Sequence, residues 1–412
     1  MTSKFWKKLT HEEIRETIFN SLDRNVNYVK EDILGVPASY LDEKVFNQDA
    51  GFLKDAPFMS ALVQNPNHIG CHTLGKSESF FAGTQEIEKE LIDICAVDIL
   101  KAEPKSYDGY VASGGTEANM QAIWIYRNYF KTTYNVTNDD IAIICSEDCH
   151  YSMDKAGNIL SLDLFKIGVD KNTRAISSET IQSAIEEAKS NGKSYFIVIA
   201  NMMTTMFGSV DNVNLLTDSL VQNECIFKLH IDGAYGGFYY PFSNEDSDMT
   251  FENEHITSFT LDAHKMAQAP YGTGIFIIKK NFIHFANTQQ ASYVEGEDYT
   301  LIGSRSGANA IASWMILVTY GPYGWYEKIY ILQKRAEWIT QQLDELGIVF
   351  YRNENSNIVT IKSEYIEKQI AQKHGLVPDN HHSPNWYKIV IMGHVTIEKL
   401  ASLAEDLRKS QI

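Results

Sequence analysis

The sequence predicts an α/β protein with a large domain on a mostly parallel sheet, a small C-terminal α+β domain and an N-terminal helical arm. Three observations support this prediction. The middle of the chain alternates short, nearly continuous apolar runs with helical segments, and such runs are typical of strands covered on both faces. From about residue 311 the pattern changes to one long helix followed by alternating strands and helices. The length of 412 residues also exceeds what one simple core usually supports.

The expected division places the arm at residues 1–58, the large domain at residues 59–312 and the small domain at residues 313–412. In the arm, Thr10–Tyr28 is expected to form an amphipathic helix, because Thr10 is a suitable N-cap and two glutamates follow it in the first turn. This helix has too few apolar residues to fold alone. We therefore expect it to pack on the main domain or on another subunit.

The regular elements of both domains follow from apolar patterning. In the large domain we expect strands over Tyr110–Ala112, Ile141–Cys145, Tyr195–Ala200 and Phe227–Asp232, a strand containing Phe259 and Leu261, a strand over Gly274–Ile278 that can run antiparallel, and helices over Thr116–Phe130 and Ser178–Ser190. In the small domain we expect a long helix through Trp325–Leu346, strands over Asn357–Lys362 and Tyr387–Met392, and helices over Tyr365–His374 and Thr396–Lys409.

Composition and charge exclude several classes of protein. A formal net charge of −17 argues against nucleic acid or an anionic membrane as the main partner, since both need a basic surface. No signal peptide or transmembrane span is evident in the first residues. The five cysteines are odd in number and irregular in spacing, which favours a reducing cytoplasm. Cys145, Cys149 and His150 lack a second Cys/His pair, so no metal site is expected.

Three motifs supply the groups that an aldehyde cofactor needs. Gly114, Gly115 and Thr116 follow a strand and open a helix, where backbone N–H groups and the helix dipole favour a phosphate. Asp232 ends a strand and can keep a pyridine nitrogen protonated. Lys265 follows a strand and is a candidate for the amine that holds the aldehyde. Each motif alone also fits an ordinary turn or a surface lysine. Together they predict a pyridoxal-phosphate enzyme.

Further segments of the chain match the motifs of one known enzyme family, and they occur in the order found in that family. They are Thr-Glu-Ala-Asn after the glycines, Cys-His-Tyr-Ser with His150, Asp-Gly-Ala-Tyr-Gly-Gly, Asp-Ala-His-Lys and Gly-Ser-Arg-Ser-Gly (Gly303–Gly307). The chain thus resembles the group II pyridoxal-phosphate-dependent amino acid decarboxylases over about Asn65–His394. The resemblance implies the fold type I architecture of the aspartate aminotransferases, with a seven-stranded sheet and a homodimer whose active site lies at the subunit interface.

The resemblance also implies roles for individual residues. Lys265 would hold the cofactor, Asp232 would pair with its ring nitrogen, and His150 and Ala234 would cover the two ring faces. Tyr293 would return a proton to the substrate carbon after carbon dioxide leaves. The remaining cofactor contacts would come from Gly114, Gly115, Thr116 and His264 at the phosphate, from Thr204 or Thr205 at a strand end, and from Ser304, which can reach the site from the partner subunit.

The substrate is less sharply defined than the cofactor. In the family, the segment before the glycines lines the pocket, and here it contains His68, His72 and Thr73. These are candidates for substrate contacts, or else residues of an ordinary interface loop. Because this segment has no arginine, a histidine-like or aromatic amino acid is favoured over aspartate or glutamate. A carbon–carbon (aldehyde) lyase or an aminotransferase on the same scaffold stays open as the alternative reaction.

Overall fold

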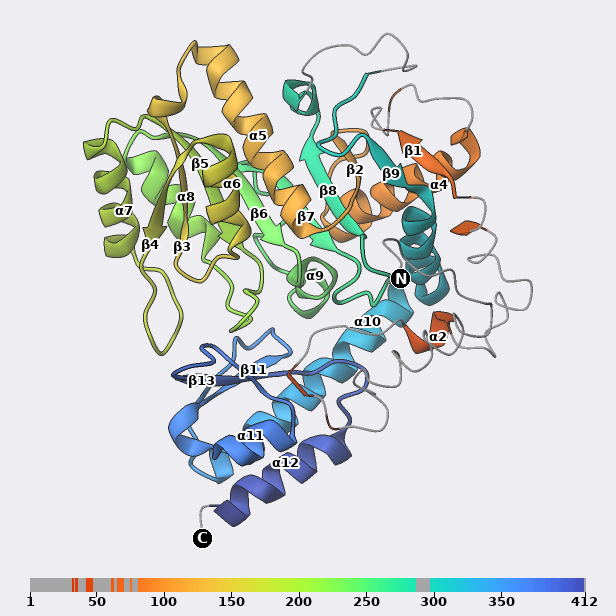
Figure 1. Ribbon diagram of the computed structural model, residues 1–412, viewed down its shortest axis with the longest axis vertical. Coiled ribbons are helices and arrows are strands. Elements are labelled where there is room, and N and C mark those ends of the chain that lie inside the picture. Colours follow the sequence, from red (N-terminus) through yellow and green to blue (C-terminus); the bar gives the residue numbers. More distant parts are fainter. Residues whose placement is uncertain are drawn as a thin grey trace, which may run out of the picture.

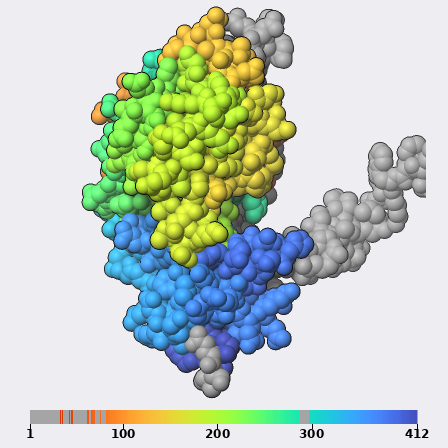
Figure 2. Space-filling view, turned by 90° about the vertical axis from the view of Figure 1, so that its left-hand side faces the viewer, coloured from red at the N-terminus to blue at the C-terminus, as the bar shows by residue number. Residues whose placement is uncertain are grey.

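The fold was analysed in a computed structural model, which describes residues 32, 34–35, 42–46, 61–62, 65–69, 75, 81–286 and 297–410. The helix expected over Thr10–Tyr28 lies outside these residues. Figure 1 shows a large part built on a central sheet and a C-terminal part below it, joined by the long helix α10 (Gly307–Glu345). In the space-filling view of Figure 2, the C-terminal part (blue) packs directly against the large part (yellow and green).

The central sheet has seven strands in the order β2-β8-β7-β6-β5-β3-β4. The strands are β2 (Tyr107–Ala112), β3 (Ile141–Ser146), β4 (Asp163–Ile167), β5 (Tyr195–Asn201), β6 (Ile226–Gly233), β7 (Ile256–Asp262) and β8 (Gly274–Lys279). Only β8 runs antiparallel to its neighbours β2 and β7, whereas the other pairs are parallel. The mostly parallel seven-stranded sheet and the antiparallel strand near residue 274 are therefore confirmed.

Helices cover both faces of this sheet, which explains the nearly continuous apolar strands. In β3, Ile141 and Ile143 belong to the core on the side of α5 (Gly115–Tyr134) and α6 (Ser152–Leu160). The intervening Ala142 and Ile144 belong to the other core, on the side of α7 (Ser178–Ser190) and α8 (Val213–Gln222). Because successive strand residues point to opposite faces, a strand buried on both sides must be apolar throughout.

Several elements of the large part were not predicted from the sequence, among them strand β4, the short strands of a second sheet, and helices α4 (Ala82–Asp93), α6 and α8. Strand β4 lies at the edge of the sheet and contains Asp163 and Lys166, so its pattern is only partly apolar. Helices α6 and α8 are short, nine and ten residues, and their periodicity is correspondingly weak. Helix α7 spans the residues expected for it, and Ser177 caps it by accepting a hydrogen bond from the Thr180 N–H.

The C-terminal part is an antiparallel sheet covered by helices, as expected. Its strand order is β10-β11-β13-β12. The elements are β10 (Phe350–Tyr351), β11 (Ile358–Lys362), α11 (Lys368–Lys373), β12 (Val377–Pro378), β13 (Trp386–Val390) and α12 (Ile397–Ser410). Helix α10 leads into this part and is interrupted at Gly321, whose φ of 63° precedes Pro322. The boundary expected between residues 312 and 313 falls inside α10 and stays a prediction.

A small second sheet is tied to the large part by a buried charged cluster. Strands β1 (Asn67–Ile69) and β9 (Ser304–Ser306) pair antiparallel, with His68 opposite Arg305. Glu88 of α4 (Ala82–Asp93) is fully buried, pairs with Arg305 and lies 2.6 Å from His68 Nδ1. Burial would raise the pKa of Glu88, but the charge of Arg305 and the hydrogen bond with His68 outweigh it and lower this pKa to about 2.

This cluster predicts the effect of neutralising its acid. Glu88→Gln should lower the free energy of unfolding at neutral pH by about 3 kcal/mol, because Arg305 would lose its buried carboxylate partner. A carboxyl group whose pKa falls from 4.5 to about 2 on folding stabilises the protein above its unfolded pKa and ceases to do so as the pH falls. Urea unfolding between these pH values should therefore show a steeper loss of stability in the wild type than in Glu88→Gln. Equal slopes would contradict this assignment.

Candidate active site

The expected cofactor residues meet at the carboxyl ends of the parallel strands. Two adjoining hollows lie there, and both are lined by His150, Ala234 and Lys265. The larger, of about 420 Å³, is also lined by Ser113, Gly114, Gly115, Thr116, Glu117, Asn119, Tyr151, Asp262, His264, Tyr271 and Gly272. The smaller is also lined by Asn201, Met203, Thr204, Thr205, Asp232 and Tyr235. Ligands of open α/β sheets bind at this end of the strands.

The glycines form an open cradle at the start of α5. Gly114 precedes the helix with a φ of 151°, which residues with side chains rarely adopt, and no side chain of the described residues caps this end. A Cβ atom at Gly115 would come within 2.7 Å of Asp262 Oδ2 and 3.2 Å of Ala234 Cβ. The helix therefore presents its first N–H groups to the cavity, as an anion site requires.

Asp232 is held in a fixed orientation at the end of β6. Its side chain is 7% exposed. The Asn119 side-chain amide donates to Oδ2 at 2.9 Å, and the Ala234 backbone N–H donates to Oδ1 at 3.1 Å. Asn119 comes from α5, the same helix whose first turn forms the cradle. The cradle and the acid thus belong to one rigid unit.

Asn119 also connects the acid to a chain of buried hydrogen bonds. Its Oδ1 lies 3.0 Å from His230 Nε2, and His230 Nδ1 lies 2.7 Å from Ser258 Oγ, which contacts the Tyr126 hydroxyl at 2.5 Å. Burial lowers the pKa of His230 to about 4, so the ring is neutral. Its one proton must lie on Nε2 to donate to the Asn119 oxygen, which leaves the Asn119 amide free to donate toward Asp232.

The same asparagine reaches His150 through Ser152. The Asn119 amide donates to Ser152 Oγ at 3.1 Å, and this hydroxyl lies 2.9 Å from His150 Nδ1. The Ser152 N–H also points at Nδ1, at 3.2 Å, so this nitrogen is an acceptor. Burial lowers the pKa of His150, with a smaller opposing effect from Asp232. A neutral, oriented imidazole suits stacking on a flat ring.

Lys265 follows β7 in a turn with two other ionisable groups. Its Nζ lies 3.4 Å from Asp262 Oδ2, and His264 Nε2 lies 3.6 Å from the same oxygen. Asp262 is 2% exposed, and burial raises the pKa of this carboxyl despite the opposing effects of Lys265 and His264. Burial likewise lowers the pKa of His264. Lys265 itself is partly exposed and lines both hollows.

The residues present fit pyridoxal phosphate. Among the described residues, two buried side-chain atoms that line the larger hollow lack a hydrogen-bond partner, His264 Nδ1 and Asp262 Oδ1. Unpaired buried polar atoms are costly, so a ligand is the natural partner. His264 Nδ1 can donate to a phosphate beside the Gly114–Thr116 cradle. At the other end, Asp232 and Lys265 line one hollow and offer the acid and the amine for the ring.

Several expected site residues are placed elsewhere. His68 is 1% exposed, and its ring nitrogens contact Glu88 and, at 2.8 Å, Thr84 Oγ1, so it is occupied in the small sheet rather than at the cavity. Ser304 lies in β9, exposed and outside both hollows. Thr204 and Thr205 line the smaller hollow. His72, Thr73 and Tyr293 lie outside the described residues.

Sequence reasoning missed Asn119 and Lys388. Asn119 stands four residues after Gly115 and so shares its helix face, a spacing that could have indicated its role. Lys388 comes from β13 of the C-terminal part and had no local signal. It is 4% exposed, and its Nζ donates to the Thr205 carbonyl at 2.9 Å. Burial, together with repulsion from Lys265, lowers the pKa of Lys388 to about 8.

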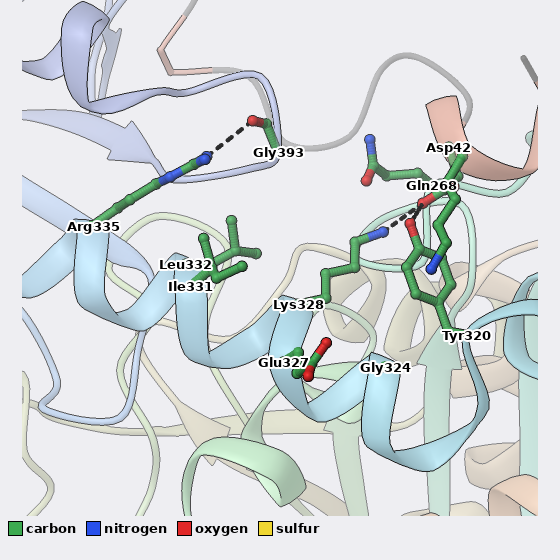
Figure 3. A pocket seen from close by; sticks show the side chains of 11 residues that line it. Asp42, Gln268, Tyr320, Gly324, Glu327, Lys328, Ile331, Leu332, Arg335 and Gly393 are labelled. Carbon is green, nitrogen blue, oxygen red and sulfur yellow. Dashed lines mark hydrogen bonds and ion pairs between the residues drawn. The ribbon is translucent and has the colours of Figure 1, made fainter.

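A second pocket, of about 360 Å³, lies between α10, α2 (Glu43–Phe46) and a C-terminal loop (Figure 3). Three of its charged groups, Asp42, Lys328 and Arg335, already have partners. Lys328 pairs with Asp42 at 2.5 Å, the Tyr320 hydroxyl donates to Asp42 at 2.8 Å, and Arg335 donates to the Gly393 carbonyl at 3.0 Å. These contacts brace α10 against its neighbours, and no reactive arrangement results.

Comparison with known proteins agrees with the site. Residues 69–360 match the family model described as the pyridoxal-dependent decarboxylase conserved domain. The chain is 49% identical to the tryptophan decarboxylase of Clostridium sporogenes over 407 residues, which cover 98% of each protein. It is 27% identical to the histidine decarboxylase of Vibrio anguillarum over 377 residues, covering 89% of this chain and 91% of that protein. The chain belongs to the pyridoxal-dependent decarboxylase family.

Solved structures share the fold at low sequence identity. The L-methionine decarboxylase of Streptomyces sp. 590 matches with a TM-score of 0.79 at 19% identity, covering 97% of this chain and 95% of that one. The TDC of Oryza sativa with PLP and tryptamine matches with a TM-score of 0.81 at 13% identity, covering 99% and 89%. The fold type I architecture is thus confirmed, and the chain is a pyridoxal-phosphate-dependent amino acid decarboxylase, a carboxy-lyase. None of the described helices combines the length and apolar character needed to cross a bilayer.

The glycine cradle predicts a binding defect. Gly115→Ala should weaken pyridoxal phosphate binding by about tenfold or more, equivalent to ~1.4 kcal/mol, because the added methyl group collides with Asp262 and narrows the cradle. Cofactor titration of the apoprotein by absorbance measures this. Gly83→Ala is the matched control, since a Cβ there meets nothing within 4 Å among the described residues. Equal affinities in the two variants would show that the phosphate binds elsewhere.

Proposed function

We propose that this decarboxylase acts on an aromatic L-amino acid, with L-tryptophan as its first substrate and tryptamine and carbon dioxide as products. The observation that carries the proposal is the 49% identity, over 98% of both chains, to a protein named tryptophan decarboxylase. The relative named histidine decarboxylase is much more distant, at 27% identity.

The lining of the site supports an uncharged side chain on the substrate. Among the described residues that line the two hollows, none is an arginine, the residue best suited to bind a carboxylate in bidentate fashion. In this proposal Lys265 binds the cofactor aldehyde, so its amine is not available to pair with a substrate side chain. An acidic side chain would therefore find no dedicated partner here, which is why aspartate and glutamate are poorer candidates.

The residues around the cofactor have separate tasks in this proposal. Pyridoxal phosphate, when bound, supplies an aldehyde for the substrate amine and a ring that takes up the electrons of the breaking carbon–carbon bond. Lys265 would hold the aldehyde through its amine until the substrate amine takes its place. Asp232 keeps a proton on the ring nitrogen. His150 and Ala234 confine the ring from its two faces.

The phosphate end anchors the cofactor against the sheet. The N–H groups at Gly115 and Thr116 and the Thr116 hydroxyl would donate to the phosphate, and His264 Nδ1, which has no partner among the described residues, would add one more donor. Thr204 and Thr205 border the opposite, smaller hollow and shape the space beside the ring. If the phosphate and the ring of the cofactor are both held, the protein also fixes the orientation of the substrate bond that is to be broken.

Lys388 is proposed to attract the substrate α-carboxylate. Within the described part of the chain no carboxylate pairs with its Nζ, although the side chain is 4% exposed. A buried ammonium group is costly without a counter-ion. Its hydrogen bond to Thr205 places it beside the smaller hollow, so the substrate carboxylate is the anion that can supply this partner.

Three further assignments complete the proposal. Tyr293 is proposed to protonate the substrate carbon after carbon dioxide leaves. A homodimer is proposed, in which Ser304 serves the partner's site. Its support is that Ser304 is exposed and outside the cavity of its own chain, and that the large side chains of Tyr323, Tyr326, Tyr330 and Ile331 on α10 are also exposed. The free thiols at Cys95, Cys145, Cys149 and Cys225 fit a reducing cytoplasm, the compartment we propose.

The substrate is tested by competition. The enzyme loaded with pyridoxal phosphate is incubated with an equimolar pool of common L-amino acids, and amines and carbon dioxide are followed by mass spectrometry. Tryptamine should appear first, and Lys265→Ala should form no amine. Histamine or β-alanine without tryptamine would overturn the substrate, and keto acids in place of amines would contradict decarboxylation.

Lys388 is tested through substrate affinity and its pH dependence. Lys388→Met should raise KM about 10–100-fold with a smaller change in kcat, since it removes a charge-assisted hydrogen bond worth ~1.5–3 kcal/mol. Because the pKa of Lys388 is lowered to about 8, the wild-type KM should rise as the pH increases through that value and the ammonium group loses its proton.

The matched control is Lys228→Met, which removes a half-buried lysine near the start of β6, at the far end of the strand from Asp232. It should leave KM and its pH profile unchanged. If Lys388→Met keeps the wild-type pH profile of KM, the carboxylate contact lies elsewhere.

A further inference from the structure

Two cysteine thiols lie in contact immediately beside the site. Cys145 is near the end of β3 and fully buried, and Cys149 is half-buried in the turn that follows. Their sulfur atoms are 3.1 Å apart. The turn is closed by the Cys149 N–H, which donates to the Ser146 carbonyl at 3.2 Å. Cys149 directly precedes His150, one of the three residues that line both hollows.

A lysine makes the two thiols chemically different. Lys166 of β4 donates from Nζ to Cys149 Sγ at 3.0 Å, and the same ammonium group lies 3.3 Å from Asp154 of α6. The hydrogen bond from Cys145, aided by Lys166, lowers the pKa of Cys149 against the effects of burial and of Asp154. The same hydrogen bond and burial raise the pKa of Cys145. Cys149 is thus the more readily ionised of the two thiols, and Cys145 lies in position to donate its S–H proton to the Cys149 sulfur.

The other described cysteines lack this arrangement. Burial raises the pKa of the fully buried Cys95 and of the half-buried Cys225. Cys225 is half-buried, like Cys149, but among the described residues no lysine is hydrogen-bonded to its sulfur. An accessible thiolate with a resolving thiol in contact is the pattern of a redox-reactive cysteine. Cys71 lies outside the described residues.

We propose that Cys149 and Cys145 form a peroxide-reactive dithiol whose oxidation to a disulfide displaces His150 and reversibly inactivates the enzyme. The Cys149 thiolate attacks one oxygen of hydrogen peroxide, so that an S–O bond forms, the O–O bond breaks and hydroxide leaves. The sulfur of Cys145 then attacks the resulting sulfenic acid, so that an S–S bond forms and the S–O bond breaks. Water leaves with the Cys145 proton, and hydroxide takes up a proton from solvent.

We expect formation of the disulfide to shift the turn that carries His150. The two sulfur atoms must approach from 3.1 Å to the bonded distance of about 2.05 Å, which draws Cys149 toward the sheet. Oxidation also removes the charge that Lys166 contacts. His150 is bonded to Cys149 through the backbone and depends on two hydrogen bonds from Ser152. A shift of this turn therefore misaligns the imidazole with the cofactor ring, while the cradle and Asp232 stay in place.

The test combines thiol chemistry with activity. The holoenzyme is treated with hydrogen peroxide, digested without reduction and mapped by mass spectrometry, and amine formation is followed in parallel. The expected result is a Cys145–Cys149 disulfide, a loss of two titratable thiols and a loss of activity, all reversed by dithiothreitol. The disulfide map does not depend on which amino acid is the substrate. Oxidation confined to Cys71, Cys95 or Cys225 would overturn the proposal, as would a disulfide that leaves activity intact.

Variants separate the attacking from the resolving thiol. Cys149→Ser should make the enzyme resistant to peroxide, and Cys145→Ser should leave a sulfenic acid on Cys149 that dimedone labels. Lys166→Gln should slow alkylation of Cys149 by iodoacetamide about tenfold at neutral pH, because less of the thiol is ionised. Cys225→Ser is the control and should stay as sensitive as the wild type. Equal sensitivity of Cys149→Ser and wild type, or unchanged alkylation in Lys166→Gln, would contradict the proposal.

Discussion

The site depends on one buried amide, the side chain of Asn119. Its NH2 group donates both to Asp232 and to Ser152, which orients His150, while its oxygen contacts His230. Each group in the chain donates to the next, from Tyr126 through Ser258, His230 and Asn119 to Asp232. A 180° flip of the Asn119 amide would therefore break its hydrogen bonds with both His230 and Asp232. Satisfied polar networks in a low-dielectric interior are rigid, and a broken one is costly. The acid and the imidazole on which the cofactor would rest are thereby fixed relative to each other.

This network also explains why the α/β architecture suits the chemistry. Helix α5 carries the phosphate cradle at its start and Asn119 one turn later, and the parallel strands β6 and β7 carry Asp232 and Asp262 at or next to their last residues. One helix and two strand ends therefore position both ends of a flat, doubly anchored ligand. The C-terminal part adds Lys388 from β13, so the proposed contact with the substrate α-carboxylate would depend on how the two sheets pack together.

Much of this arrangement could be predicted from sequence because the signals are local. The runs at Ile141 and Tyr195 predicted buried parallel strands, and the glycines after β2 predicted the cradle. Contacts between distant segments could not be predicted in this way. Lys388 is 183 residues from Thr205 in the chain, and its own strand gives no sign of the partner. His68 looked like a substrate contact, but pairing of β1 with β9 brings it to Glu88 and Arg305. Strand β4 was not predicted because it lies at the edge of the sheet, where a strand is only partly buried and its residue pattern is only partly apolar.

We expect the Asp232 carboxylate, oriented by Asn119, to keep a proton on the ring nitrogen of the bound cofactor. The most direct measurement is the ¹⁵N NMR chemical shift of pyridoxal phosphate labelled at that nitrogen and bound to the enzyme. We expect a protonated nitrogen in the wild type that persists at mildly alkaline pH, and an unprotonated nitrogen in Asp232→Asn. A nitrogen that is unprotonated in the wild type, or that is equally protonated in both proteins, would show that Asp232 does not hold this proton.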